Sequence, residues 1–282
     1  MRNIKKSRPG QRWKSLVFGL ASLSLVAVTT YHLQIIPFWV SFIDSSSLIK
    51  IISYFFLACL IVLFLGLAFR LSLRLKYRPE TIKTVDPVDF PFVSVIVPAY
   101  NEEKWIGRAV ESILASDFPQ DKLELICIND GSTDGTLSVL EKMRRHDPAR
   151  IKVISFNQNR GKKAALFRGI KEASGQIVIT TDADSQLQRR AIKNLILPLL
   201  ADERVGAVAG KVAVLNENKN LMTRMLAIRY ALAFDFGRAY QSVYGGVLCC
   251  PGALSAFRKR ILLKVIHSWK RQKFLKAACQ HG

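Results

Sequence analysis

Two aspartates separated by one residue, Asp182 and Asp184, are the strongest chemical signal in this chain; they follow an apolar run over residues 176–181. A carboxylate pair of this kind suits a hard divalent cation, and Mg²⁺ prefers carboxylates together with substrate phosphates over an all-protein cage. If a diphosphate leaves during the reaction, such a cation neutralises the charge that develops as the bond breaks. The pair therefore predicts a metal shared with a diphosphate.

Three further polar residues complete a possible nucleotide site. Asp130, in the stretch NDGSTDGT of residues 129–136, could accept a hydrogen bond from a base N–H such as uracil offers. Tyr100 could stack on that base, and Lys162 could meet the base or a phosphate as a mobile point charge. Each loop taken singly is explained as well by helix capping or a turn. Taken together, the four polar loops at residues 100–103, 129–136, 157–166 and 182–185 favour a nucleoside-diphosphate site.

Strands and helices that alternate along the chain are expected to position these loops. Apolar, β-branched runs predict strands over residues 92–100, 123–129, 151–156 and 176–181, and helical spacing predicts helices over 105–116, 135–145 and 162–173. This alternation indicates a parallel α/β sheet, whose ligands bind beyond the carboxyl ends of the strands. The first strand lacks a GxGxxG turn, and the stretch NRGKKAAL lacks the upstream glycine and the Ser/Thr of a P-loop.

The first seventy residues indicate a membrane anchor. Residues 16–36 and 51–69 form two apolar runs, each near the 20 or so residues that cross a bilayer. Cations cluster outside both ends of the pair and are nearly absent from the connector, which predicts a hairpin with both termini cytoplasmic. A cleaved signal peptide would need a shorter apolar stretch. The predicted segments are a basic tail (1–14), two spans (within 15–70), a linker (71–91) and a soluble domain (92–282).

Charge and cysteine content exclude other classes of protein. The net charge of +21 follows the membrane-flanking pattern and comes with no nucleic-acid motif, so no nucleic-acid partner is expected. Five cysteines without a CxxC pair make neither a disulfide framework nor a zinc site and suit a reducing cytoplasm. Cys59 and Cys127 are expected to be small buried hydrophobes, and a packing role is expected for Cys249 and Cys250. Helical spacing also predicts a helix over residues 221–240, on which Asp235 is expected to face solvent or a cation.

The motifs, taken in order, resemble a known family. VSVIVPAYNEE, INDGSTDGT, NRGKKAAL and TTDADS are similar to the glycosyltransferase family that includes cellulose, chitin and hyaluronan synthases, over about residues 92–282. Residues 229–259 and 269–282 look most like hyaluronan synthases and chitin-oligosaccharide synthases. The resemblance implies a GT-A (Rossmann-like) fold and transfer of a sugar, with inversion, from a UDP-sugar to a growing β-linked chain. It also implies Mg²⁺ or Mn²⁺ as cofactor.

The resemblance further implies roles for individual residues. Five residues are expected to contact the nucleotide-sugar, Asp184 is expected to bind the metal, and residues 245–252 are expected to line the acceptor site. The expected donors are UDP-N-acetylglucosamine, UDP-glucuronate or both, and the acceptor a polysaccharide or a lipid-linked sugar. The enzyme is expected in the cell membrane, in contact with lipid, with its catalytic domain in the cytoplasm. The nucleotide-sugar set is Tyr100, Glu102, Asp130, Lys162 and Asp182; the acceptor set is Gly245, Cys250 and Gly252.

The sequence departs from the family pattern at its end. The family's catalytic base is an Asp in a Gly-Asp-Asp-Arg or Gly-Glu-Asp-Arg stretch, which would be expected just after Gly282, and the QxxRW motif would follow it. Removal of a general base costs about 10²–10⁴-fold in rate. The chain is therefore expected to bind a donor and to transfer poorly. Two alternatives stay open: a non-processive glycosyltransferase that acts on a lipid-linked acceptor, and a truncated UDP-sugar-binding pseudoenzyme.

Overall fold

A six-stranded sheet forms the centre of the molecule. The structure, a computed structural model, describes residues 47–78 and 90–271. The strand order is β3-β2-β1-β4-β6-β5. Strands β1 to β4 are parallel and lie within one residue of the predicted bounds. The strands are β1 (Val93–Ala99), β2 (Leu123–Asn129), β3 (Ile151–Ser155), β4 (Ile177–Thr181), β5 (Ala207–Ala209) and β6 (Leu254–Arg258).

The sheet is mixed, which corrects the expectation of a wholly parallel one. β6 runs antiparallel to β4, and β5 runs antiparallel to β6. Both strands are short, and neither shows an alternation long enough to predict. Because Thr181 at the end of β4 pairs with Leu254 at the start of β6, the residues just before β6 lie beside those just after β4. This pairing brings the predicted acceptor segment to the edge of the sheet where the aspartates lie.

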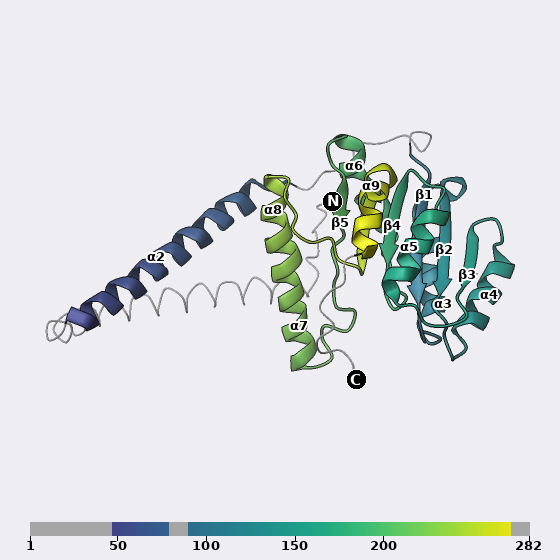
Figure 1. Cartoon of the computed structure of the whole chain (residues 1–282), viewed down its shortest axis with the longest axis horizontal. Coiled ribbons are helices and arrows are strands. Elements are labelled where there is room, and N and C mark those ends of the chain that lie inside the picture. Colours follow the sequence, from purple (N-terminus) through teal and green to yellow (C-terminus); the bar gives the residue numbers. More distant parts are fainter. Residues whose placement is uncertain (1–46, 79–89, 272–282) are drawn as a thin grey trace, which may run out of the picture.

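Helices cover both faces of the sheet and make it a three-layer fold (Figure 1). Val95 and Val97 of β1 belong to the core on one face, and Ile96 belongs to the core on the other, so β1 is buried on both sides. Such strands read as continuous apolar runs because each face meets a helix. One face is covered by α3 (Ile106–Leu114), α4 (Thr136–His146) and α6 (Ala191–Ala201), the other by α5 (Lys162–Glu172) and α9 (Lys259–Arg271).

A helical column stands beside the sheet (Figure 1). It consists of α7 (Leu221–Ala231), the π-helical turn η3 (Leu232–Arg238) and α8 (Ala239–Val243), where the sequence predicts one helix over residues 221–240. The long helix α2 (Ser47–Lys76) meets the column at α8 and extends away from it. At this junction Arg74 Nε donates a hydrogen bond to the carbonyl oxygen of Asp235 over 2.6 Å.

Helix α2 contains the second predicted span. Residues Lys50–Lys76 are long and apolar enough to cross a membrane, and large apolar side chains such as Phe55 and Phe64 are exposed along them. Among residues 47–78 and 90–271 this is the only helix of that kind. The first predicted span (16–36), the basic tail and most of the connector lie outside the described residues. The described part therefore supports one candidate crossing and does not by itself support a multi-pass hairpin.

Candidate active site

A cleft of about 230 Å³ opens at the carboxyl ends of the parallel strands. It is the place where ligands bind in open α/β sheets, because the loops after several strands converge there. The structure brings all six predicted donor-site and metal-site residues to this one cleft, together with the backbone at the end of β1. The six are Tyr100, Glu102, Asp130, Lys162, Asp182 and Asp184.

The loops after β1 and β2 are joined by hydrogen bonds. Asn101 has a positive φ of 56°, a conformation that asparagine tolerates better than most residues. Its Oδ1 accepts from the backbone N–H of Thr133 over 2.9 Å. The next amide, that of Glu102, donates to Thr136 Oγ1 over 2.8 Å. These bonds fix Tyr100 and Glu102 at the rim of the cleft.

Asp130 is the most deeply buried carboxylate of the cleft, with an exposed fraction of 3%. Its Oδ1 accepts from the backbone N–H of Arg160 over 2.8 Å, and its own N–H donates to the carbonyl of Ala99 over 2.8 Å. The next residue, Gly131, has a φ of +70°, and a Cβ there would collide with the backbone of Gln158. Only glycine therefore allows the β2 and β3 loops to approach closely enough to hold Asp130.

Lys162 and Asp182 form an ion pair across the cleft. Lys162 is the first residue of α5, and Asp182 follows β4 directly. The lysine side chain is about half exposed and the aspartate side chain about a third exposed, so the pair lies at the surface of the cleft. The ammonium group can therefore reach a phosphate placed over the sheet edge.

The cleft concentrates negative charge. The pKa of Glu102 is raised above its ordinary value, first by desolvation and then by the neighbouring charges of Asp184, Asp134 and Asp182. For Asp134, burial alone would raise the pKa, but hydrogen bonds from Thr136 and Glu103 lower it overall. Mutual repulsion of this kind is relieved by a cation.

The carboxylates fit a cation that is completed by its substrate. In the described part of the chain, no three His, Cys, Asp or Glu side chains are grouped so as to hold a metal by themselves. Mg²⁺ and comparable ions accept one or two carboxylates and take further oxygens from phosphates. The Asp182 and Asp184 pair provides that number of ligands.

The predicted acceptor residues differ in their distance from the donor residues of the cleft. Gly252 lies beside Lys162, since a Cβ added to it would be 3.3 Å from Lys162 Nζ. Gly245 has a φ of +71° and begins the loop that leads to β6, and Cys250 is half-buried in it. None of the three is among the residues that line the cleft.

The expectations for four cysteines have different outcomes. Cys127 is buried as expected, and desolvation raises the pKa of its thiol to about 12, which makes it inert. Cys59 is exposed on α2, so its expected burial is wrong, and Cys249 is exposed in the loop, so its expected packing role is wrong too. The pKa of Cys250 is raised by desolvation and by Cys249, against the opposing effect of Arg238. Asp235 pairs with Lys211 over 2.6 Å, as expected of a residue that faces a cation.

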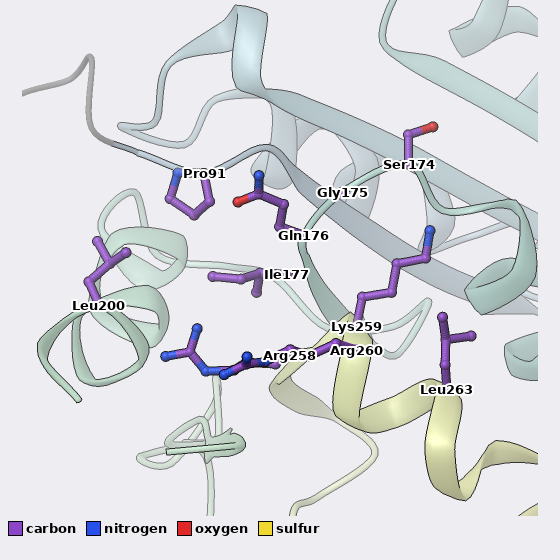
Figure 2. Close-up of a pocket in the computed structure, with 10 residues that line it drawn as sticks. All are labelled: Pro91, Ser174, Gly175, Gln176, Ile177, Leu200, Arg258, Lys259, Arg260 and Leu263. Carbon is purple, nitrogen blue, oxygen red and sulfur yellow. The ribbon is translucent and has the colours of Figure 1, made fainter. Parts of the chain in front are cut away.

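A larger cavity of about 530 Å³ lies at the opposite edge of the sheet and lacks the chemistry of the cleft. Figure 2 shows Arg258, Lys259 and Arg260 gathered where β6 passes into α9. Arg258 donates to the carbonyl oxygens of Val205 and Leu199, and Lys259 donates to that of Ala173. These cations satisfy backbone groups at the ends of α6 and α5, so they serve the fold.

Sequence reasoning did not assign the residues that hold the cleft together. Asn101, Thr136 and the backbone N–H of Arg160 position Glu102 and Asp130. The first two belong to polar stretches that the sequence singles out, but their partners lie 30 or more positions away in the chain. An asparagine directly after a predicted strand was the one available signal, because asparagine is enriched at positive φ.

Comparison with known proteins agrees with this geometry. The model of "Glycosyl transferase family 2" matches residues 94–266. The chain is 30% identical to an N-acetylglucosaminyltransferase of Neorhizobium galegae (67% of this chain, 44% of the relative) and 29% identical to a hyaluronan synthase of Streptococcus pyogenes (76% and 51%). It thus spans about half the length of the curated relatives it matches.

A solved structure shares the fold. The mannosyltransferase of Pyrobaculum calidifontis, in complex with GDP-Man and Mn²⁺, is 30% identical with a TM-score of 0.57, over 71% of this chain and 53% of that one. The family model extends over more than half of the residues and includes every strand from β1 to β6 apart from the first residue of β1. The chain therefore belongs to glycosyltransferase family 2.

Proposed function

We propose that the cleft binds a UDP-sugar with a divalent metal and presents the sugar for inverting transfer to a β-linked polysaccharide. The observation that carries this proposal is the convergence of Asp130, Lys162, Asp182 and Asp184 on one cleft, from the loops after β2 and β4 and from the start of α5. A fold alone does not define an activity, but charged groups of these types at one sheet edge match the needs of a nucleoside diphosphate.

Each residue is assigned to one part of the nucleotide. Asp130 is buried, and its carboxylate has more lone pairs than the bond from Arg160 uses, so it can accept a base N–H. Tyr100 is exposed at the rim, where its ring can stack on the base. Lys162 meets the diphosphate, and Asp182 and Glu102 complete the nucleotide contacts. All of these groups follow the carboxyl ends of the parallel strands β1 to β4.

Asp184 is the residue we assign to the metal. The relative from Pyrobaculum calidifontis contains Mn²⁺, which supports a divalent cation, either Mg²⁺ or Mn²⁺, at the corresponding place in this chain. When bound, the cation neutralises charge on the departing diphosphate. Desolvation is the first cause of the raised pKa of Glu102, and the charges of Asp184 and Asp182 add to it; these added charges support a cation here independently of the relative.

Acceptor and location are proposed from the relatives and from α2. The names hyaluronan synthase and N-acetylglucosaminyltransferase support UDP-N-acetylglucosamine or UDP-glucuronate as donor and a growing polysaccharide as acceptor. Gly252, next to Lys162, is the acceptor-side residue nearest to the donor groups. Arg70, Arg74, Lys76 and Arg78 at the end of α2 support a cytoplasmic catalytic domain on a membrane anchor.

Base preference tests this proposal. With Mn²⁺ present, UDP should bind the chain more tightly than GDP or ADP, because the larger purines do not match a site built for uracil. Asp130→Asn should weaken UDP by about tenfold with or without metal, as expected for loss of a charged hydrogen-bond acceptor. Equilibrium binding by calorimetry measures both. Tighter binding of GDP than UDP would contradict the uracil assignment, and equal UDP affinity in Asp130→Asn would remove Asp130 from the site.

Transfer can be measured on the same preparation. Each carboxylate that lines the cleft is already assigned to the nucleotide or the metal, so we expect donor binding without sustained polymer formation by this chain. Incorporation of label from UDP-N-acetylglucosamine and UDP-glucuronate gives the readout. Sustained polymer would show that one of Glu102, Asp130, Asp182 and Asp184, or another residue of the chain, acts as the base, and the assigned roles would need revision.

A further inference from the structure

Arg238 belongs to the helical column and contacts the loop that leads from the column to β6. It is the last residue of η3, and its guanidinium lies 3.9 Å from the ring centroid of Phe234. Its Nε donates a hydrogen bond to the carbonyl oxygen of Cys249 over 3.2 Å. A guanidinium stacked on an aromatic ring keeps its plane fixed while its N–H groups point outward. Arg238 is therefore built to hold the backbone of the loop at Cys249.

The loop over residues 245–252 connects the column to β6. At its start, the N–H of Gly246 donates to the carbonyl of Gln241 over 3.2 Å. At its end, Thr181 Oγ1 donates to the carbonyl of Ala253 over 3.0 Å, beside the β4 strand end. Arg238 contacts the loop between these two points, at Cys249. Two further bonds lie within the loop, from the N–H of Leu248 to Gln241 Oε1 over 3.4 Å and from Ser255 Oγ to the carbonyl of Pro251 over 2.6 Å, so the bond of Arg238 is one of three restraints there.

The far end of this loop lies near the donor lysine. A Cβ added to Gly252 would be 3.3 Å from Lys162 Nζ, so the loop backbone faces the ammonium group at this point. The same ammonium pairs with Asp182. Lys162 therefore lies between the carboxylate of Asp182 and the loop backbone at Gly252, three residues after Cys249.

The column itself is held in place on its other side. Asp235, three residues before Arg238, accepts a hydrogen bond on its carbonyl from Arg74 at the end of α2, and its carboxylate pairs with Lys211. Two cations from distant segments thus fix η3. π-Helical turns shift the side chains that follow them and are frequent at functional sites. The Arg238 backbone consequently has a defined position relative to the sheet and to α2.

From these contacts we propose that Arg238 is a positioning residue for nucleotide binding: by holding the Cys249 carbonyl, it sets the 245–252 loop against Lys162 and keeps the ammonium where a diphosphate binds. This inference rests on the proposed function, because it assumes that Lys162 meets the diphosphate. Arg238 touches no substrate and acts through Lys162. Loss of its hydrogen bond loosens the loop at Cys249, and a looser loop restrains the lysine less.

Hydrogen exchange of the full chain tests the first half of the proposal. In Arg238→Met, the peptide amides of residues 245–252 should exchange about tenfold faster, since a hydrogen bond from a charged donor is worth roughly a decade in an equilibrium constant. Exchange in β1 to β4 should stay unchanged, and the melting temperature should fall by no more than a few degrees. Arg224→Met, an exposed arginine on the same column, is the matched control and should leave the loop unchanged.

A double-mutant cycle on UDP affinity tests the second half. Arg238→Met should weaken UDP by about three- to tenfold, which is the range of coupling between residues of one network. In a Lys162→Met background the same substitution should have little effect, because the residue through which it acts is gone. A general loosening of the fold would instead weaken UDP equally in both backgrounds, and that additive result would overturn the positioning role.

The two readouts separate the possible failures. Unchanged loop exchange in Arg238→Met would show that Arg238 does not hold the loop. Faster exchange with unchanged UDP affinity would show that the loop does not set Lys162. A wild-type chain that binds no UDP would refute the proposed function, and loop exchange would still decide whether Arg238 holds Cys249. If Arg238→Met does not fold, Arg238→Lys keeps the cation near Phe234 without the fixed Nε and should shift both readouts in the same direction.

Discussion

At the level of single residues, the ion pair of Lys162 with Asp182 neutralises part of the negative charge of the cleft. One carboxylate is partnered by the lysine, whereas Asp184 and Glu102 remain close enough for their charges to repel. A diphosphate would compete with Asp182 for the ammonium, and a divalent metal would offset the carboxylates. Metal and nucleotide are therefore expected to bind cooperatively. The metal reduces the repulsion between the carboxylates and the diphosphate, and the diphosphate supplies further oxygen ligands for the metal.

The raised pKa of Glu102 predicts a pH-dependent gain in stability when its charge is removed. An acid whose pKa is raised by folding destabilises the folded state above its folded pKa, and this cost disappears below its unfolded value, ordinarily 4.5. Glu102→Gln should therefore raise the melting temperature at pH 7 in EDTA and give no gain at pH 4. Thermal unfolding at the two pH values measures this.

A control for that prediction lies on α4. Glu141 pairs with Arg144 over 2.8 Å and is not among the residues of the cleft, so Glu141→Gln should give no gain at pH 7. If Glu102→Gln stabilised equally at pH 4 and pH 7, neither the desolvation of the Glu102 carboxylate nor its repulsion by neighbouring acids would be the cause of the effect.

The side chains that meet in the cleft were predictable from sequence where they directly follow a predicted strand. Asp130, Asp182 and Asp184 follow predicted strands, and parallel strands bring their ends to one edge, so their meeting followed from the fold class. The supporting bonds were not predictable in the same way. Arg160 acts through its backbone N–H and Gly252 through its lack of a Cβ, and neither property depends on a recognisable side-chain pattern.

At the level of elements, the close approach of α5 to the sheet depends on Gly169. A Cβ there would lie 2.5 Å from Ile96 Cγ2 and 2.9 Å from Ile128 Cδ1, so Gly169→Ala should destabilise the fold by about 1–3 kcal/mol through overpacking. Gly107 in α3 offers a matched control, since its Cβ would meet Val139 at an ordinary 3.6 Å. Gly107→Ala should be neutral or stabilising by up to about 1 kcal/mol because alanine favours helix.

Chemical denaturation of both variants checks this pair. Opposite signs for the two glycines would confirm that packing against Ile96, rather than helix propensity, governs Gly169. A stabilising effect of Gly169→Ala would contradict the close contact between α5 and β1.

Element prediction succeeded for the strands rich in β-branched apolar residues and failed for β5 and β6, which lack such a run. β1 and β2 have seven residues each, buried almost throughout, and their composition marks them plainly. β5 has three residues and β6 five, and the direction of β6 depends on its pairing with β4, a long-range contact. The π-helical turn between α7 and α8 has the same apolar spacing as the helix around it, so the sequence predicted one continuous helix.

At the level of the whole molecule, the proposed membrane orientation places the sheet in the cytoplasm. In a cysteine-free background, Ser138→Cys on the exposed surface of α4 should resist an impermeant thiol reagent added to intact cells. Ser46→Cys, in the predicted external connector, should react. Permeabilised cells provide the control, in which both positions should be labelled. Labelling of position 138 in intact cells would reverse the orientation and with it the cytoplasmic donor site.

The assignment of the whole chain as a metal-dependent donor-binding domain depends on Asp184. Calorimetric titration of UDP into wild type and Asp184→Asn, with and without Mn²⁺, measures that dependence. We expect Mn²⁺ to increase UDP affinity in wild type and Asp184→Asn to remove about tenfold or more of that increase, or about 1.4 kcal/mol. An equal increase of affinity by Mn²⁺ in both proteins would show that Asp184 does not hold the metal and that the cleft is not the donor site described.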